Sequence, residues 1–480
     1  MSADLFPPLM FAGLVVFLLL GYPVAFSLAA NGLLFALLGI HQGLLTADLL
    51  GALPHRIYGI MLNETLLAIP FFTFMGLILE RSGMAEDLLD TIGQLFGSIR
   101  GGIAYAVIFV GALLAATTGV VAASVISMGL ISLPIMLRYG YDRRLSAGVI
   151  AAAGTLAQII PPSLVLIVLA DQLQRPVSLL YQGAILPGLM LTGMYAAYVF
   201  GVAWFKPNAA PALPPEARTL RGGKLFSHAI VTLVPPLLLI FLVLGTIFLG
   251  IATPTEGGAM GATGALVLAL LKHRLKFSLL KQAMDTTAKL SSFVMFILIG
   301  STVFGLVFRA VNGDAWVDHL LTSLPGGVIG FLIVVNLLIF FLAFFLDFFE
   351  LAFIVVPLLA PVAHKLGIDL VWFGVLLAVN MQTSFMHPPF GYALFFLRSV
   401  APKADYVDKV TGKLTAGVKT SQIYRGAIPF LMIQILMVAL IIAFPEITGI
   451  RAEKVEVDVP LQLDIPMEQN VAPAPFNFRP

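Results

Sequence analysis

The sequence predicts an all-α polytopic membrane protein built from two inverted repeats, each with a re-entrant helical hairpin and a broken helix. The first observation behind this prediction is composition. The 480 residues are 59% hydrophobic and only 11% charged, with a mean hydropathy of +1.01. Many apolar runs approach the roughly 20 residues that a membrane helix needs. The chain has no cysteine, which excludes disulfides and thiolate metal sites.

The second observation is a pattern of glycine, aspartate and paired prolines that occurs twice. Gly140-Tyr141-Asp142 precedes an apolar run of helix length that ends at Pro161-Pro162. Gly367-Ile368-Asp369 precedes a similar run that ends at Pro388-Pro389, with the same spacing from aspartate to proline. Helices interrupted at matching points of two halves indicate a membrane transporter whose binding site lies at the interface between the repeats.

The apolar runs predict the elements in order along the chain. Two long segments with a break in the middle, 102–134 and 326–364, are expected to be hairpins that enter and leave the membrane on one side. Residues 43–60, 82–98 and 275–289 have the pattern of helices that lie along the membrane surface. Single crossings are expected at residues 6–20, 23–40, 66–80, 146–170, 183–204, 229–250, 251–271, 291–310, 371–400 and 426–444.

Loop charges give the orientation. The loops 206–228, 272–281 and 398–425 are rich in lysine and arginine, so the positive-inside rule places them in the cytoplasm. Counting crossings from these loops puts the base of the first hairpin in the cytoplasm and that of the second on the opposite face. The two repeats are therefore expected to be inverted. The polar tail 445–480 is expected to be disordered and periplasmic.

These segments predict a division into scaffold and repeat regions. The regions are N-terminal scaffold helices with an interfacial segment (1–65), a first repeat (66–205) with hairpin 102–134 and broken helix 146–170, a cytoplasmic loop with scaffold helices (206–271), a second repeat (272–425) with hairpin 326–364 and broken helix 371–400, a last scaffold helix (426–444) and the polar tail (445–480).

The four breaks are the candidate binding site. An unwound helix frees backbone carbonyls, and neighbouring hydroxyl and amide oxygens add ligands that suit a weakly held sodium ion. Half-helix N-termini can also face an anionic group of a substrate. The candidates in the first half are Thr117, Thr118, Gly119, Ser124, Gly154, Thr155, Gln158 and Pro161. The candidates in the second half are Asp347, Glu350, Asn380, Gln382, Thr383, Ser384, His387 and Gly391.

Each candidate also has a purely structural interpretation. A single serine or threonine can bond back to its own helix or join two helices. Asp347 and Glu350 would each cost roughly 3 kcal/mol at membrane depth, which favours a function, although they could instead cap the returning helix at a wet tip. His387 is either a proton-linked group or, as we favour, a hydrogen-bond donor to freed carbonyls. Thr253-Pro254-Thr255-Glu256 predicts a helix start.

Several motifs together resemble the large membrane subunit of tripartite ATP-independent periplasmic (TRAP) transporters, within the ion transporter superfamily. The resemblance runs to about residue 445, and it rests on the order and spacing of the motifs rather than on any one of them. They are Gly21-Tyr22-Pro23-Val24-Ala25-Phe26, Leu67-Ala68-Ile69-Pro70-Phe71-Phe72, Arg100-Gly101-Gly102, Ile159-Ile160-Pro161-Pro162-Ser163, Thr253-Pro254-Thr255-Glu256, Leu366-Gly367-Ile368-Asp369 and Pro388-Pro389-Phe390-Gly391.

The resemblance implies a multi-pass protein of the bacterial inner membrane that is a secondary transporter and not an enzyme. It implies sodium ions as coupling ions, no other cofactor, and an elevator motion of a hairpin-bearing domain against a scaffold. It further implies two protein partners, a small four-helix membrane subunit and a periplasmic substrate-binding protein that delivers an organic acid, often a carboxylate. No nucleic acid is implied. No four-helix segment precedes residue 1, so the small subunit is expected to be a separate chain.

Sodium sites in this superfamily pair each hairpin tip with the break in the following helix. The resemblance therefore pairs Thr117–Ser124 with Ala153–Pro162, and Phe344–Glu350 with Asn380–Gly391. This chain departs from the common pattern, because Ser124 stands where an aspartate is usual. Phe348-Phe349-Glu350 follows Asp347, where a small polar residue is common, and His387 stands where a longer branch of the family has a threonine. The acidic second tip and the insert Lys403–Tyr424 fit a longer branch of the family, and the number of sodium ions stays open.

Two other classes of function compete with this one. A stand-alone sodium–carboxylate symporter of the same superfamily would need no binding protein. A membrane enzyme would need convergent histidine and acidic residues or a nucleophile with a base, and a channel would need a selectivity-filter repeat. The sequence shows neither pattern, and it does not identify the organic acid.

Overall fold

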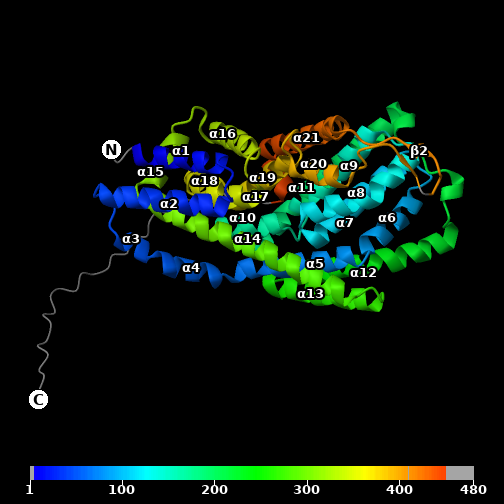
Figure 1. The fold of residues 1–480 in the computed structure, drawn as a ribbon, viewed down its shortest axis with the longest axis horizontal. Helices are drawn as coiled ribbons and strands as arrows, with labels where there is room; N and C mark the ends of the chain where they lie inside the picture. Colours follow the sequence, from blue (N-terminus) through cyan, green and yellow to red (C-terminus); the bar gives the residue numbers. More distant parts are fainter. Residues whose placement is uncertain (1–4, 409, 450–480) are drawn as a thin grey trace, which may run out of the picture.

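In the computed structural model, which describes residues 5–408 and 410–449, the chain is almost entirely helical (Figure 1). Seven of the described helices are long and apolar enough to cross a membrane, or up to nine if each of two bent pairs is one span. This agrees with the predicted all-α membrane protein. Most of the tail predicted at 445–480 lies outside the described residues, as do the side chains of Thr117 and Thr118.

Helices α4, α5, α12, α13 and α14 run along the lower side of Figure 1, and together with five neighbouring helices they form what we call the scaffold group. Its closest pairs are α13 on α5 and α14 on α2. Gly261 allows α13 to approach α5, because a Cβ there would lie 2.4 Å from the Met75 sulfur. The group consists of α1 (Phe6–Leu19), α2 (Val24–His41), α3 (Asp48–Gly51), α4 (Leu53–Met61), α5 (Glu64–Arg81), α6 (Met84–Leu95), α12 (Gly222–Phe248), α13 (Pro254–Leu271), α14 (Phe277–Ala310) and α15 (Gly313–Thr322).

Two expectations for the scaffold group are wrong. The surface helix predicted at 275–289 and the crossing predicted at 291–310 are one helix, α14. No proline or glycine separates them, and at 1.5 Å per residue the 34-residue helix reaches about 51 Å. The sequence also predicts interfacial loop charges at Asp314 and Asp318, but both residues lie on the short helix α15, which begins after Asn312 in a left-handed conformation. The helix start predicted at Thr253 is confirmed, with Glu256 completing a capping box.

A second group, which we call the hairpin group, contains both predicted hairpins and both broken helices. The first half comprises α7 (Gly102–Thr118), α8 (Val121–Arg138), α9 (Arg143–Thr155), η2 (Leu156–Gln158), α10 (Leu164–Gln172) and α11 (Val177–Phe205). The second half comprises α16 (Gly327–Leu342), α17 (Phe348–Glu350), the π-helical η5 (Leu351–Val355), α18 (Val356–Lys365), α19 (Leu370–Gln382), η6 (Thr383–Phe385), α20 (Tyr392–Val400) and α21 (Thr420–Ala443).

The two halves of the hairpin group have matching element bounds. The helix α9 and the turn η2 recur as α19 and η6 at an offset of 227 residues, which is also the separation of Thr155 and Gln382. At the same offset, the span of α8 recurs as that of α17 to α18. Asp142 and Asp369 cap α9 and α19 by accepting backbone N–H groups, and the Pro161-Pro162 and Pro388-Pro389 bonds are both cis.

The last helix, α21, packs against α9, α11 and α19. At its crossing with α9 the backbones nearly touch, since a Cβ on Gly148 would lie 2.1 Å from the carbonyl oxygen of Gly426. Only small residues permit such an approach between membrane helices. Residues 426–444 are predicted to be the last scaffold helix; in the structure α21 packs against helices of the hairpin group, and we describe it with them.

The insert between α20 and α21 is held against the C-terminal end of α8. Its two strands, β1 (Tyr406–Val407) and β2 (Leu414–Thr415), pair antiparallel. The Arg138 guanidinium at the end of α8 donates to both carboxylate oxygens of buried Asp408, at 2.9 to 3.1 Å. This contact holds the pKa of Asp408 well below its usual range. The remaining short 3-10 turns are η3 (Pro207–Ala209), η4 (Pro215–Ala217) and η7 (Pro445–Thr448).

Candidate functional site

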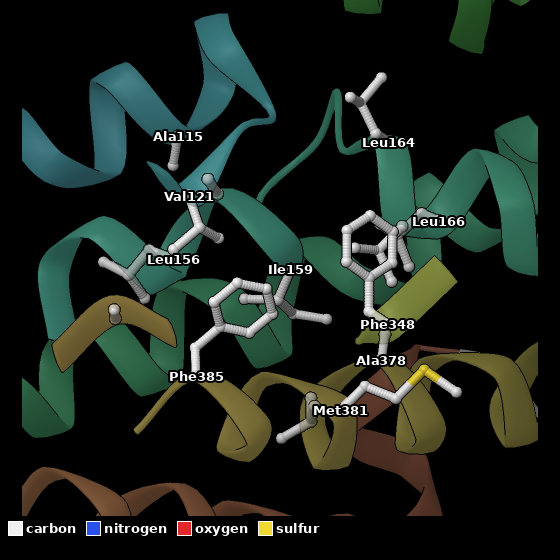
Figure 2. Packing of buried hydrophobic residues seen from close by; sticks show 14 of the residues in the cluster. Ala115, Val121, Leu156, Ile159, Leu164, Leu166, Phe348, Ala378, Met381 and Phe385 are labelled. Atoms are coloured by element: carbon white, nitrogen blue, oxygen red, sulfur yellow. The ribbon is translucent and has the colours of Figure 1, made fainter. Parts of the chain in front are cut away.

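A cavity of about 390 Å³ lies where the two hairpin tips approach each other. Cavities of this size lie within the range of small-molecule sites. Figure 2 shows buried side chains of both hairpins and both broken helices packed together, among them Val121, Ile159, Phe348 and Phe385. The lining residues are Gly119, Val120, Val121, Ala122, Leu164, Leu290, Phe293, Asp347, Phe348, Phe349, Glu350, Phe385, Tyr392 and Phe396.

The first hairpin tip and the first helix break lie together, as the sequence predicts. Gly119 closes the tip in a left-handed conformation (φ +57°), which a residue with a side chain rarely adopts. Gly154 brings the broken helix against α8, since a Cβ there would lie 2.3 Å from the Val125 side chain. Ser124 is buried on α8. The backbone of the break is therefore within reach of the tip.

Only some of the polar groups at the first break have hydrogen-bond partners among the described residues. The Ser163 hydroxyl, just after Pro161 and Pro162, donates to the Gln158 carbonyl oxygen at 2.5 Å. The Gln158 side chain is fully buried, and neither its amide nitrogen nor its amide oxygen has a partner in the described part of the chain. A buried amide without partners is costly, so this group is the strongest candidate ligand of the first break.

Asp347 and Glu350 form a capping box at the second tip. Asp347 Oδ1 accepts from the Glu350 N–H at 2.9 Å, and Glu350 Oε2 accepts from the Asp347 N–H at 2.8 Å. This is the structural role that the sequence left open for the pair. It uses one oxygen of each carboxylate, and both residues also line the cavity. Capping therefore leaves Asp347 Oδ2 and Glu350 Oε1 available to a ligand.

The second break carries the other candidates. The Asn380 amide donates to the carbonyl and the side-chain oxygen of Asn336, both at 2.9 Å. The Thr383 hydroxyl donates to the Asn380 carbonyl at 2.6 Å. The buried Ser384 hydroxyl has no partner in the described residues. Gly391 permits a tight backbone turn, since a Cβ there would lie 2.5 Å from the Phe385 carbonyl oxygen.

His387 does not have the role that we favoured from the sequence. Its ring nitrogens are buried, and neither has a hydrogen-bond partner among the described residues, so the predicted bond to freed carbonyls is absent there. The ring instead stacks on Phe344 at 4.4 Å and meets Phe340 edge-on at 4.2 Å. The aromatic residues of α16 and of the second tip occupy the space around the imidazole.

Thr155 and Gln382 join the two broken helices directly. The Gln382 amide donates to the Thr155 hydroxyl oxygen at 3.1 Å. The same oxygen accepts from Gln434 of α21 at 3.3 Å, and Gln434 also donates to the Tyr195 hydroxyl at 2.9 Å. Sequence reasoning missed Gln434 and Tyr195. An available signal was Gln434 itself, because an amide in an otherwise apolar membrane helix usually joins helices.

Polar contacts connect the hairpin group to the scaffold group at several points, among them the ion pair of Lys365 with Asp318 Oδ2 at 2.7 Å. Asn63 donates to Asp171 Oδ1 at 2.6 Å, and the Ser127 hydroxyl donates to Glu80. The Ser301 hydroxyl of α14 donates to the Phe353 carbonyl at 2.6 Å, in the π-helical segment of the second hairpin. These contacts join the two groups at separate points of their boundary.

The ligands at the site are carbonyl, hydroxyl, amide and carboxylate oxygens. The described part of the chain has no group of three or more histidine, cysteine or acidic residues that could hold a metal ion. Such a set of mostly neutral oxygens is hard in the chemical sense and unlike the sites that bind transition metals.

Comparisons with known proteins give one consistent result. Residues 11–447 match the family model described as "Tripartite ATP-independent periplasmic transporter, DctM component". The C4-dicarboxylate TRAP transporter large permease protein of Pseudomonas aeruginosa is 30% identical, over 84% of this chain and 90% of its own length. The sialic acid TRAP transporter large permease protein of Vibrio cholerae is 28% identical, over 90% of this chain and 95% of its own.

A solved structure agrees in fold. The YdaH transporter of Alcanivorax borkumensis superposes with a TM-score of 0.56 at 17% identity, over 84% of this chain and 91% of that one. At this identity the likeness concerns the fold alone.

Proposed function

Because the chain belongs to the family of DctM components of tripartite ATP-independent periplasmic transporters, we propose that it carries out sodium-coupled secondary uptake of an organic acid. It is an integral inner-membrane permease and not an enzyme. Permeases of this family work with a substrate-binding protein and a small permease subunit. We propose that the partners of this chain are a separate four-helix membrane subunit and a periplasmic binding protein that delivers a carboxylate.

The observation that carries the sodium proposal is the proximity of both tips and both breaks to one cavity. Buried oxygens without a hydrogen-bond partner among the described residues lie at both breaks, on Gln158 and Ser384, and the capping box leaves an oxygen on Asp347. We propose that one sodium site lies between the first tip and the Gly154–Pro161 break. A second lies between Asp347 and the Asn380–Gly391 break, with Thr383 and Ser384 among the ligands. Carbonyl and hydroxyl oxygens at unwound helices are the ligands that coordinate sodium in such transporters.

The division into two helix groups supports an elevator mechanism. The offset of 227 residues between matching elements supports an inverted structural repeat. In such a repeat each half contributes one hairpin, and the two hairpins enter the membrane from opposite faces. In this proposal the hairpin group, with α21, moves as one body against the scaffold group. The contacts of Asn63, Ser127 and Ser301 then belong to one position of that body and break when it moves.

The sodium proposal is tested by uptake into proteoliposomes that hold the complete transporter. Asp347→Asn keeps an oxygen for the helix cap but removes the charge. We expect it to raise the half-saturating sodium concentration about tenfold, which corresponds to about 1.4 kcal/mol. Asp142→Asn is the matched control, because Asp142 also caps a helix but does not line the cavity. A normal sodium dependence in folded Asp347→Asn protein would remove Asp347 from the site.

A further inference from the structure

The cavity between the two hairpin tips, which we call the tip cavity, is lined by acidic but not by basic side chains of the described residues. Among the described residues, the charged groups of the lining are Asp347 and Glu350, and lysine, arginine and histidine are absent from it. Five phenylalanine rings form most of the remaining wall, together with the Tyr392 ring. A substrate carboxylate in this cavity therefore meets no basic side chain of the described residues.

Two kinds of polar feature remain for a substrate. The capping box occupies Asp347 Oδ1 and Glu350 Oε2, so the second oxygen of each carboxylate is a hydrogen-bond acceptor at the cavity. Elsewhere in the lining, Val121 and Leu164 are the first residues of α8 and α10, whose N-terminal ends carry partial positive charge. The cavity thus offers carboxylate oxygens as hydrogen-bond acceptors and helix N-termini as sources of weak positive potential.

The proposed sodium ion on Asp347 would offset the charge of that carboxylate, and the described lining adds no basic side chain to pair with a substrate carboxylate. Like charges repel strongly where protein and lipid replace water. A substrate with two carboxylates has little means of keeping both away from Glu350 in a cavity of about 390 Å³. A hydroxyl or ammonium group, in contrast, can donate to Glu350 and satisfy its free oxygen.

We propose that the tip cavity selects a monocarboxylate that presents a hydroxyl or ammonium donor to Glu350 and an apolar face to the phenylalanine rings, and that it rejects C4-dicarboxylates. This inference rests on the proposed function, because it assumes that the tip cavity is the transport site. It separates this chain from its relative named for C4-dicarboxylates, despite the 30% identity between the two.

The test is the thermal stability of the purified chain with its small subunit, measured in sodium with three probes. Mandelate is a monocarboxylate with a hydroxyl group and a ring, phenylacetate lacks the hydroxyl group, and succinate is a C4-dicarboxylate. A ligand that binds the folded state raises the melting temperature. We expect a rise of several degrees with mandelate, a smaller rise with phenylacetate, and none with succinate. An equal or larger rise with succinate, or no rise with any probe, overturns the proposal.

Glu350→Gln tests the role of the carboxylate, because glutamine can still accept the capping hydrogen bond. We expect the advantage of mandelate over phenylacetate to shrink and succinate to gain a measurable rise. Glu256→Gln is the matched control, since Glu256 has the same position in the capping box of α13 but lies outside the cavity. An unchanged ranking in Glu350→Gln removes Glu350 from substrate selection. Replacing sodium by potassium separates the two proposals, because a mandelate effect that persists in potassium refutes sodium coupling and not the substrate class.

Discussion

Thr155→Val removes the hydroxyl group that joins the two broken helices through hydrogen bonds. Valine has nearly the same shape as threonine but has no hydroxyl group, so the change leaves packing almost intact. The hydroxyl donates to the Ala152 carbonyl at 2.8 Å and accepts from Gln382 and Gln434. All three contacts lie in a fully buried part of the hairpin group.

The expected loss of stability in Thr155→Val depends on which hydrogen bonds Gln434 and Gln382 keep. Gln434 keeps its bond to Tyr195, but the Gln382 amide nitrogen loses its hydrogen-bond partner in the described residues. An unsatisfied buried donor costs about 1–3 kcal/mol. Hydrogen bonds between membrane helices average only about 0.6 kcal/mol, with a maximum near 1.7 kcal/mol. We therefore expect Thr155→Val to lower the free energy of unfolding by about 1–2 kcal/mol.

The assay is equilibrium unfolding in mixed micelles, followed by the fluorescence of the three tryptophans. Thr263→Val is the control, because its exposed hydroxyl bonds only to the Ala259 carbonyl of its own helix; we expect a change within about 0.5 kcal/mol. A double mutant with Gln382→Leu should cost less than the sum of the two single variants, since both remove the same bond. Strict additivity, or an unchanged stability of Thr155→Val, would refute the reasoning.

The other predictions concern packing, the insert, orientation and partners. Gly148→Ala should cost at least about 1–3 kcal/mol by overpacking the α9–α21 crossing, whereas Gly193→Ala, with nothing within 4 Å, should be neutral in the same assay. Wild-type protein should lose protease protection of the 401–419 insert only as pH falls through the lowered pKa of Asp408. In Arg138→Gln this loss should move up toward pH 4 or so, and an identical cleavage profile would contradict the contact. A single cysteine at Leu220 should react only from the cytoplasmic side, and labelling only from outside would reverse the proposed orientation. Sodium-driven uptake should require both proposed partners, and full uptake by the chain alone would favour the stand-alone symporter.

Local chemistry explains which parts of the fold could be predicted from the sequence. Asp142, Asp369 and the two proline pairs fix helix starts and breaks through the backbone, so the bounds of the broken helices follow from the sequence. No such signal separates residues 275–289 from 291–310, and the two predicted elements are one helix. The short helix α15 begins at a left-handed asparagine, Asn312, which propensity alone does not reveal.

The candidate site shows the same limit. The residues of both breaks could be selected because polar groups are rare in the surrounding apolar runs. The hydrogen-bond partners of these residues could not be predicted, since Thr155 accepts from Gln434, which lies 279 positions away. The surroundings of His387 come from Phe340 and Phe344 of the second hairpin, and only the packed structure brings them to the ring. A sequence pattern therefore indicates where a site lies better than which contacts its members make.

The bond between Thr155 and Gln382 joins two matching positions of the chain. In the inverted repeat that we propose, such a pair meets on the axis that relates the two halves. A protein with identical halves would place the same residue against its own copy at this point, and that residue would have to be both donor and acceptor. Here the two copies have diverged, so that the glutamine donates and the threonine accepts. The threonine copy is also the one that receives Gln434, a third partner with no counterpart in the other half among the hydrogen bonds of the described residues. At this contact, the two halves of the proposed repeat are therefore no longer interchangeable.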